Sequence, residues 1–423
     1  MHNSKCSLEA ISSFGSNMSS DCPESSLLCG MNISLLHNVS PALLDELCLS
    51  EKEYLALHLG PLRSPLFAPV CITYLSIFLV GVVGNSLTCA VIFQYKVMQT
   101  PTNLYLLSLA LSDLLVLLVG MPLELLELWQ SYPFPLGEAG CYFKTFLFET
   151  VCFASVLNVT ALSVERYIAV VHPLKVKSLS TRAHVKKVIV LLWVMSMVCA
   201  VPNTSLHGIL FLPPVFGRQF PRSAMCYLVQ PTWMYKLTIL VTALVFFLLP
   251  VLVMGVLYLL IGLTLSRERT HCSTTSGAIS VSEAHMQRLN NRNVQVTKML
   301  SVLVAVFGVC WVPFHVDRLM WSFLDTSSQL HLMIFEPVHV VSGAFFYLSS
   351  AVNPVLYSLM STRFREMFNH LTRPQHSWPD RFSFSQRSTL SQKASSTYRG
   401  PHNTAYPLDT FSFIYPAFCH LST

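Results

Sequence analysis

Seven stretches of this chain are apolar for about 20 residues or more, the length a helix needs to cross a lipid bilayer. They occupy residues 67–93, 103–129, 144–171, 183–202, 234–265, 294–323 and 332–360. In lipid only a helix or a closed barrel satisfies its own backbone hydrogen bonds. The sequence therefore predicts an all-α membrane protein, a seven-transmembrane helix bundle.

The composition agrees with a membrane protein. Hydrophobic residues make up 52% of the chain and charged residues only 11%, against about 25% charged residues in soluble domains. No basic segment followed by an apolar one marks a cleaved signal near the start, so the first span is expected to be the anchor.

Basic residues set the expected orientation, because loops rich in lysine and arginine stay in the cytoplasm. They cluster between spans three and four and between spans five and six: Lys175, Lys177, Arg182, Lys186, Lys187, Arg267, Arg269, Arg288 and Arg292. With seven spans, the N-terminus is expected outside the cell, the C-terminus inside, and the chain in the plasma membrane.

The sequence divides the chain into four expected segments. Residues 1–66 are acidic and serine-rich and are expected to form a disordered, glycosylated outside tail. Residues 67–361 are expected to form the seven-helix domain. In residues 362–371, Phe364, Met367 and Phe368 recur at helical spacing, which predicts a short amphipathic helix on the membrane surface. Residues 372–423 are expected to be a disordered cytoplasmic tail and a phosphorylation substrate.

Short motifs predict covalent modifications outside the cell. Glycosylation sequons begin at Asn17, Asn32, Asn38 and Asn203. Cys141 and Cys226 both fall outside, where a disulfide between them would tie the second outside loop to the bundle. Four more cysteines of the tail could pair in ways that the sequence does not decide: Cys6, Cys22, Cys29 and Cys48.

Carboxylates inside the spans are the strongest functional signal, because a charge in hydrocarbon costs a few kcal/mol. Asp113, Glu124 and Glu127 share span two. At about 100° per residue, Glu124 points within roughly 20° of Asp113 and lies about 16 Å nearer the outside. Glu149 of span three is expected at a similar depth to Glu124. These carboxylates therefore predict an acidic cavity open to the outside.

Two interpretations of that cavity remain open. In one, it receives a cationic ligand whose guanidinium forms bidentate contacts with carboxylates. In the other, Glu127 extends to the membrane interface and Glu124 pairs with a basic residue of the chain, such as Arg318.

Two further sets of residues lie deeper in the spans. Asn85, Asp113, Ser155, Ser349 and Asn353 could hold a sodium ion or form a water-filled hydrogen-bond network. Prolines at 250, 313 and 354 predict kinks. Phe307 and Trp311, one turn apart beside Pro313, either form a rotating switch or simply fill the core.

Motifs in six of the seven spans resemble the rhodopsin-like G-protein-coupled receptors. The motifs are GN at 84–85, LSLALSD at 107–113, ERY at 165–167, Trp193, CWVPF at 310–314 and NPVLY at 353–357. Longer segments, among them VPNTSLHG and VFGVCWVPFHVDRLMWS, resemble the neuromedin-U receptors of the ghrelin, motilin and neurotensin receptor group. LSVERYIAVVHPL and TRAHVKKV favour the type 1 branch.

The resemblance implies roles for residues near the cytoplasm. Arg166 would pair with Glu165 in the resting state and, once released, would meet the G protein. The remaining residues expected in coupling and switching are Tyr167, Tyr258, Phe307, Trp311, Pro313, Asn353, Pro354 and Tyr357.

The resemblance also implies a ligand and partners. The ligand would be an amidated, arginine-containing peptide such as neuromedin U or neuromedin S, and its arginine would meet Glu124, Glu127 and Glu149. The cavity would also be lined by Phe148, Phe314, Arg318 and His339. Signalling would run mainly through Gq/11, phospholipase C and calcium, with Gi as a further candidate, and the tail would meet arrestin and receptor kinases.

Other functional classes fit less well. The chain shows no HExxH, nucleophile elbow or phosphate-binding glycine loop, so an enzyme is not expected. Residues 332–360 lack the lysine that a retinal protein needs, and no internal repeat suggests a transporter. A receptor for another peptide of the ghrelin and neurotensin group and a ligand-independent membrane scaffold stay open. Apart from sodium, no cofactor, metal or nucleic-acid partner is expected.

Overall fold

The structure, a computed structural model, describes residues 27, 46, 49–173, 181–274, 281–323, 329–360 and 362–372. In these ranges, seven helical stretches are long and apolar enough to cross a membrane, which confirms the predicted fold class. They are Phe67–Gln94 (α4), Pro101–Trp129, Gly137–Val171 (α7), Arg182–Thr204 (α9), Thr232–Arg267, Val294–Phe323 and Pro337–Ser358. The second span consists of α5 (Pro101–Leu115), η3 (Val116–Gly120) and α6 (Met121–Trp129). The fifth begins with α10 (Thr232–Ala243) and η5 (Leu244–Leu248).

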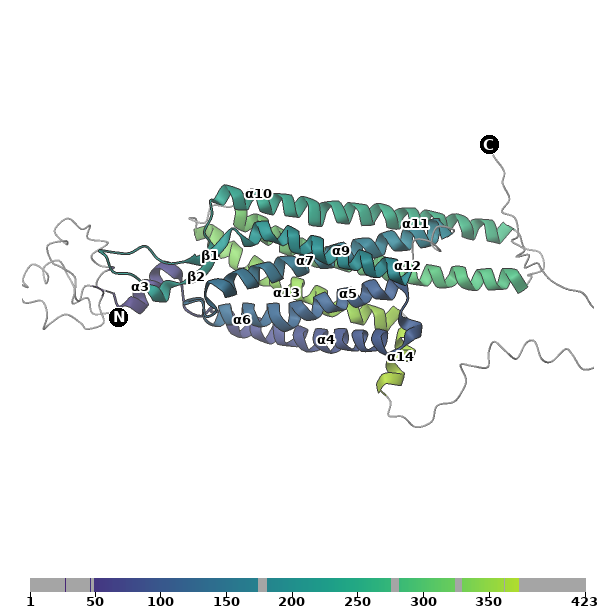
Figure 1. The fold of residues 1–423 in the computed structure, drawn as a ribbon, viewed down its shortest axis with the longest axis horizontal. Helices are drawn as coiled ribbons and strands as arrows, with labels where there is room; N and C mark the ends of the chain where they lie inside the picture. Colours follow the sequence, from purple (N-terminus) through teal and green to yellow (C-terminus); the bar gives the residue numbers. More distant parts are fainter. Residues whose placement is uncertain are drawn as a thin grey trace, which may run out of the picture. The chain divides into compact units, whose positions relative to one another are not determined.

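The last three spans belong to longer helices. The fifth continues into α11 (Leu249–Thr274), the sixth lies in α12 (Val281–Phe323) and the seventh in α13 (Gln329–Met360). The helices run side by side along one axis, with α13 packed against α12 and α4, and α7 packed against α9, α11 and α5 (Figure 1).

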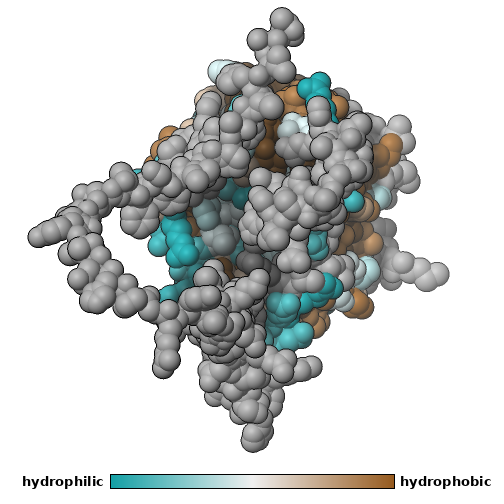
Figure 2. Space-filling view, turned by 90° about the vertical axis from the view of Figure 1, so that its right-hand side faces the viewer, coloured by the Kyte–Doolittle hydropathy of each residue, from teal (hydrophilic) through white to brown (hydrophobic). Residues whose placement is uncertain are grey.

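The two ends of the bundle carry different elements. At one end lie α3 (Glu51–Leu59) and a hairpin of β1 (His207–Leu210) and β2 (Met225–Leu228), and at the other lies α14 (Thr362–Thr372) (Figure 1). We call them the hairpin end and the α14 end. In Figure 2 the α14 end faces the viewer. Hydrophilic residues are seen on this end face and hydrophobic residues along the sides of the bundle, as expected for helices surrounded by lipid.

Two apolar clusters fill the bundle between the helices. One, around Leu117, Trp311 and Tyr347, occupies the part that contains Glu124 and Glu149. The other, around Leu300 and Tyr357, lies toward the α14 end. The lipid-facing sides of the helices are also apolar, so the polar and charged side chains inside the bundle mark its functional regions.

Wide helical turns precede two prolines. In η5 the Leu249 amide donates to the Leu244 carbonyl, just before Pro250, where a kink was predicted. In η3 the Met121 amide donates to the Val116 carbonyl, just before Pro122, a site that the sequence analysis missed. Proline has no amide hydrogen to donate, and a turn with i→i+5 bonds accommodates that loss.

The predicted disorder of residues 1–66 is wrong for its final part. Ser50 and Glu53 form a capping box, in which each side chain accepts a hydrogen bond from the other residue's backbone amide, and α3 follows. The tail's sequons and cysteines lie outside the described residues: Asn17, Asn32, Asn38, Cys6, Cys22, Cys29 and Cys48. Residues 373–423 lie outside them as well.

The short helix after the last span is present as α14. Phe364, expected on the membrane surface, is instead 4% exposed and packs beside Tyr357, with 6.3 Å between the ring centroids. One of the three expected membrane contacts is thus a contact with the bundle.

Helices α4 and α13 approach each other closely where Gly84 faces Pro354. A Cβ atom added at Gly84 would lie 2.8 Å from the Cβ of Pro354. The proline ring cannot rotate away, so the two helices would have to separate. Gly262 in α11 has no atom within 4 Å of the same position.

We expect Gly84→Ala to destabilise the bundle by about 1–3 kcal/mol, because the added methyl group overpacks this contact. Gly262→Ala is the matched control and should be neutral or stabilising, since alanine favours a helix by up to about 1 kcal/mol. Thermal unfolding of the detergent-solubilised protein measures both. Equal unfolding temperatures for the two variants would contradict the close approach.

Candidate functional site

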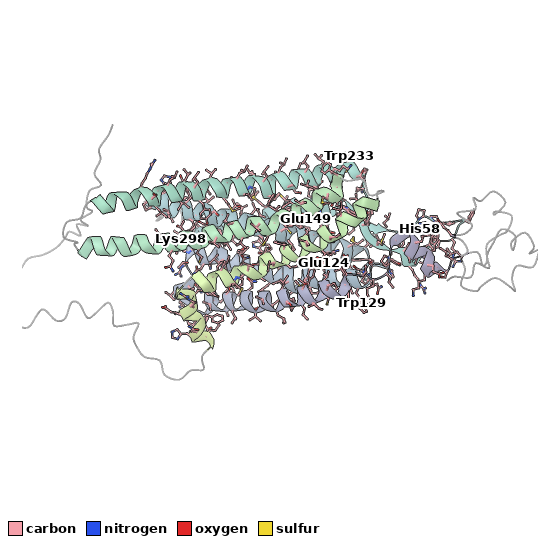
Figure 3. The ribbon with its side chains drawn as sticks, turned by 180° about the vertical axis from the view of Figure 1, so that it is seen from behind. His58, Glu124, Trp129, Glu149, Trp233 and Lys298 are labelled. Carbon is pink, nitrogen blue, oxygen red and sulfur yellow. A yellow bond between two sulfur atoms is a disulfide. The ribbon has the colours of Figure 1, made fainter. Side chains whose placement is uncertain are left out.

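Glu124 of α6 lies inside the bundle in the part nearer the hairpin end (Figure 3). The Tyr74 hydroxyl donates to its Oε1 at 2.8 Å, and the Tyr347 hydroxyl donates to its Oε2 at 2.6 Å. Both tyrosines are buried, at 2% and 1% exposed. No described residue forms an ion pair with Glu124, so hydroxyl groups alone solvate this carboxylate within the described part of the chain.

Glu149 of α7 is 2% exposed and has a cationic partner. Arg318 Nη2 of α12 lies 2.7 Å from its Oε1, and Asn203 Nδ2 of α9 donates to the same oxygen at 2.9 Å. The proposed pairing of Arg318 with Glu124 is therefore wrong, because Arg318 pairs with Glu149 instead. This contact joins three helices, the consecutive spans α7 and α9 and the distant α12.

The other acidic residues of this region also have partners. Glu127 forms an ion pair with Lys144 of α7, and the His339 Nδ1 atom lies 3.1 Å from Asp317 Oδ2. The sequence analysis missed Lys144 and Asp317. Asp317 directly precedes Arg318, so the acidic residue beside the basic one was the available signal.

These groups give the cluster an excess of negative charge. Its carboxylates are Glu124, Glu127, Glu149 and Asp317, and its permanent cations are Lys144 and Arg318. Four carboxylates and two cations give the cluster a formal net charge of −2 while His339 is neutral. In a region of low dielectric constant, such an excess attracts a cation strongly.

Aromatic rings pack next to the charged cluster. Phe148, Phe314 and Phe346 pack with centroids 5.1 to 5.8 Å apart, and the Arg318 guanidinium lies 5.4 Å from the Phe314 centroid. The Trp311 ring contacts the Phe314 ring edge to face, and it stacks on the Phe307 ring with 4.8 Å between the ring centroids. Phe307 and Trp311 thus share a face beside Pro313 of α12, as predicted; their action as a switch stays a prediction.

Asp113 and its neighbours line a cavity deeper in the bundle. Asn353 Nδ2 donates to Asp113 Oδ2 at 2.8 Å, and Ser155 and Ser349 are among the other lining residues. Asn85, which was expected in the same set, is not among the residues that line this cavity; its Nδ2 donates to the Gly81 and Ser350 carbonyls. The carboxylate and hydroxyl oxygens suit a small hard cation. Clusters of three or more His, Cys, Asp or Glu able to hold a metal are absent from the described residues.

An ion pair lies toward the α14 end. Arg166 Nη2 is 2.6 Å from Glu165 Oε2, and Thr102 of α5 contacts both residues. Tyr258 and Tyr357 belong to the same apolar cluster nearby, and Tyr167 packs against His172. The pairing that the resemblance implied is present, and the role of these residues in coupling stays a prediction.

The hairpin end is fixed by a disulfide. Cys141 and Cys226 are bonded, which confirms the predicted pair, and their Cα atoms lie 5.5 Å apart. Cys226 faces Ile209 across the antiparallel β1–β2 pair. The bond therefore holds the hairpin at the start of α7.

The position of Asn203 in this structure does not favour the predicted glycan, which stays a prediction. Asn203 is 3% exposed at the end of α9, and its Nδ2, the atom that would carry the sugar, donates to Glu149. A sequon is a local pattern, whereas the burial of this side chain depends on how α7 and α9 pack.

Known proteins resemble this chain over most of its length. Residues 84–357 match the family described as 7 transmembrane receptor (rhodopsin family). Neuromedin-U receptor 1 of Homo sapiens is 55% identical, covering 79% of this chain and 82% of that protein. Neuromedin-U receptor 2 of Mus musculus is 50% identical, covering 78% and 81%. The chain belongs to the rhodopsin family of seven-transmembrane receptors.

A receptor of another type is less similar in sequence to this chain. Growth hormone secretagogue receptor type 1 of Sus scrofa is 37% identical, covering 74% of this chain and 84% of that protein. Within the rhodopsin family the chain therefore groups with the neuromedin-U receptors, and the type 1 receptor is favoured, as the sequence predicted. Members of this family are receptors and not enzymes, which confirms the exclusion of an enzyme.

We expect Glu149→Gln to destabilise this receptor by about 3–5 kcal/mol, because it leaves the Arg318 charge buried without its partner. Replacing both residues, Glu149→Gln with Arg318→Gln, should recover part of that loss, since neither charge is then unpaired. Thermal unfolding of the two single variants and the double variant measures the coupling. Strictly additive losses would contradict a direct ion pair.

Proposed function

We propose that the chain is a plasma-membrane receptor for neuromedin U, with the hairpin end outside the cell and the α14 end inside. The names of the relatives that are 50–55% identical support this ligand. The positive charges between the third and fourth spans support the orientation. Neuromedin S is a second ligand of the same chemistry.

Glu124 carries the proposal. It accepts one hydrogen bond on each oxygen, both from neutral hydroxyls, and no described residue neutralises it. A carboxylate has acceptor capacity for further bonds, and an arginine guanidinium supplies donors in the matching geometry. The arginine of an amidated peptide would therefore bind Glu124. Glu127, Phe148, Phe314 and His339 would line the same cavity.

Inside the cell we propose coupling mainly to Gq/11, phospholipase C and calcium, with Gi as a further partner. Arg166, now held by Glu165 and Thr102, would be released on activation and would meet the G protein beside Tyr258 and Tyr357. Arrestin and receptor kinases would act on the C-terminal tail, which lies outside the described residues.

We also propose a sodium ion as an allosteric ligand of the deeper cavity. Asp113, Ser155, Ser349 and Asn353 would hold it, because their oxygens are the donors that such a cation prefers. The bound cation would neutralise the one carboxylate of that cavity.

Glu124→Gln should lower the potency of amidated neuromedin U by about ten- to a hundredfold, the cost of removing one partner of a desolvated charge pair. Calcium release in expressing cells measures it, with surface expression recorded. Glu138→Gln is the matched control, because Glu138 is exposed at the start of α7, where its carboxylate accepts a hydrogen bond from the hydroxyl of Tyr142 on the same helix. Unchanged potency at normal surface expression would remove Glu124 from the binding site.

Arg166→Ala should abolish the calcium response and leave binding of labelled peptide intact, because Arg166 lies in the α14 half, away from the acidic cluster. Arg182→Ala, at the exposed start of α9, should change neither. Loss of peptide binding in the Arg166 variant would show that the residue supports folding rather than coupling.

A further inference from the structure

Gly343 of α13 faces the Tyr74 hydroxyl, the group that donates to Glu124 Oε1. A Cβ atom added at Gly343 would overlap the Tyr74 hydroxyl oxygen and would lie 3.4 Å from Glu124 Oε1. The hydroxyl therefore reaches the carboxylate through the space in which any other residue at this position has its side chain. Only glycine leaves that space free.

Gly343 lies on the face of α13 that meets the acidic cluster. His339, Gly343 and Tyr347 follow one another at intervals of four residues, so they lie along one face of the helix. His339 contacts Asp317, and Tyr347 donates to Glu124. The glycine thus stands between two side chains of the cluster, at the point where the Tyr74 hydroxyl of α4 arrives.

The Tyr74 ring has little room to adjust. It is 2% exposed and belongs to the apolar cluster that fills this part of the bundle. It also packs edge to face against Tyr347, with 4.8 Å between the ring centroids. Because the surroundings are close-packed, a methyl group at Gly343 would displace the hydroxyl from Glu124.

The two tyrosines together hold the plane of the Glu124 carboxylate. One hydroxyl binds each oxygen, at 2.8 Å and 2.6 Å, and the two donors come from different helices, α4 and α13. A carboxylate held at both oxygens cannot turn about its last bond without losing one of these contacts. Each oxygen still has acceptor capacity, so the group is presented to a further donor in one orientation.

We propose that Gly343 and Tyr74 are positioning residues, which hold the Glu124 carboxylate in the orientation that selects a guanidinium over an ammonium group. This inference rests on the proposed function, in which Glu124 receives the arginine of the peptide. A guanidinium is a planar fork that binds both carboxylate oxygens at once, whereas a lysine ammonium is a compact charge with rotatable donors. A carboxylate that is free to turn would keep its charge and lose this selectivity.

A role in helix packing alone predicts a different result. At Gly84 the added Cβ meets the ring of Pro354, so a larger residue there separates two helices without moving a polar group. At Gly343 the clashing atom is the Tyr74 hydroxyl oxygen, and Cζ of the same ring lies 3.4 Å away, an ordinary contact. Tyr74→Phe removes the oxygen and should therefore remove the clash.

Thermal unfolding of the detergent-solubilised receptor tests this contact without a ligand. Gly343→Ala should lower the unfolding temperature by a few degrees in the wild type and change it little beside Tyr74→Phe. Tyr347→Phe is the matched background, because it removes the hydroxyl on the other oxygen of Glu124 and leaves the clash in place. Gly255→Ala is the control for alanine itself, since its added Cβ has no atom within 4 Å. Equal losses from Gly343→Ala in all three backgrounds would overturn the contact.

Calcium release in expressing cells tests the selectivity. Amidated neuromedin U is compared with analogues that carry lysine in place of arginine, one position at a time. In the wild type we expect one such replacement to lower potency by about tenfold or more, the value of one charge-assisted hydrogen bond.

Gly343→Ala and Tyr74→Phe should each reduce that potency ratio to about threefold or less, and Gly255→Ala should leave it unchanged. A receptor that is only destabilised would respond less to both peptides and keep the ratio. A wild-type ratio in either variant would overturn the positioning role of that residue.

The outcomes separate this inference from the proposed function. No calcium response of the wild type to amidated neuromedin U would refute the proposed ligand, and the unfolding temperatures would still decide the contact. A normal response with the same arginine-to-lysine ratio in the wild type and in both variants would refute the positioning role alone. Should Gly343→Ala fail to reach the cell surface, Tyr74→Phe, which only removes an atom, still measures the ratio.

Discussion

Charged groups between these helices need an ion-pair partner or hydrogen-bond donors from other side chains, because lipid and packed aromatic rings surround them. Each ion pair of the cluster joins two different spans: Glu149 binds Arg318, and Glu127 binds Lys144. The pairs therefore fix the rotation of α6, α7 and α12 about their axes. A helix turned by one residue would carry its charge into hydrocarbon, so the acidic cluster and the fold depend on the same contacts.

Sequence predicted the spans well and the partners poorly, for one physical reason. Hydropathy is a local property, so the expected first span, 67–93, differs from the observed Phe67–Gln94 by one residue. Pairing depends on how distant helices face each other, and the pattern of one helix does not contain it. The interpretation in which Arg318 pairs with Glu124 failed for that reason, and a sequon carries no information on the burial of Asn203.

The helix α3 shows a signal that was present and overlooked. The capping box at Ser50 and Glu53 is readable in the sequence, but the average acidity of the tail concealed it. Its stability also needs distant contacts: Tyr54 stacks on Phe220 at 5.0 Å, and the Tyr132 hydroxyl donates to the Gly60 carbonyl at 3.0 Å. Burial, reinforced by the charge of Glu46, raises the pKa of Tyr54.

The difference between Glu124 and Glu149 follows from what a ligand would have to displace. A guanidinium that took Glu149 from Arg318 would leave a buried cation unpaired, at a cost of about 3–5 kcal/mol. At Glu124 the tyrosine hydroxyls can stay in place while a further donor binds, and one charge-assisted hydrogen bond contributes about 1.5–3 kcal/mol. The cost at Glu149 exceeds the free energy that such a bond contributes, which supports placing the positive charge of the proposed ligand at Glu124.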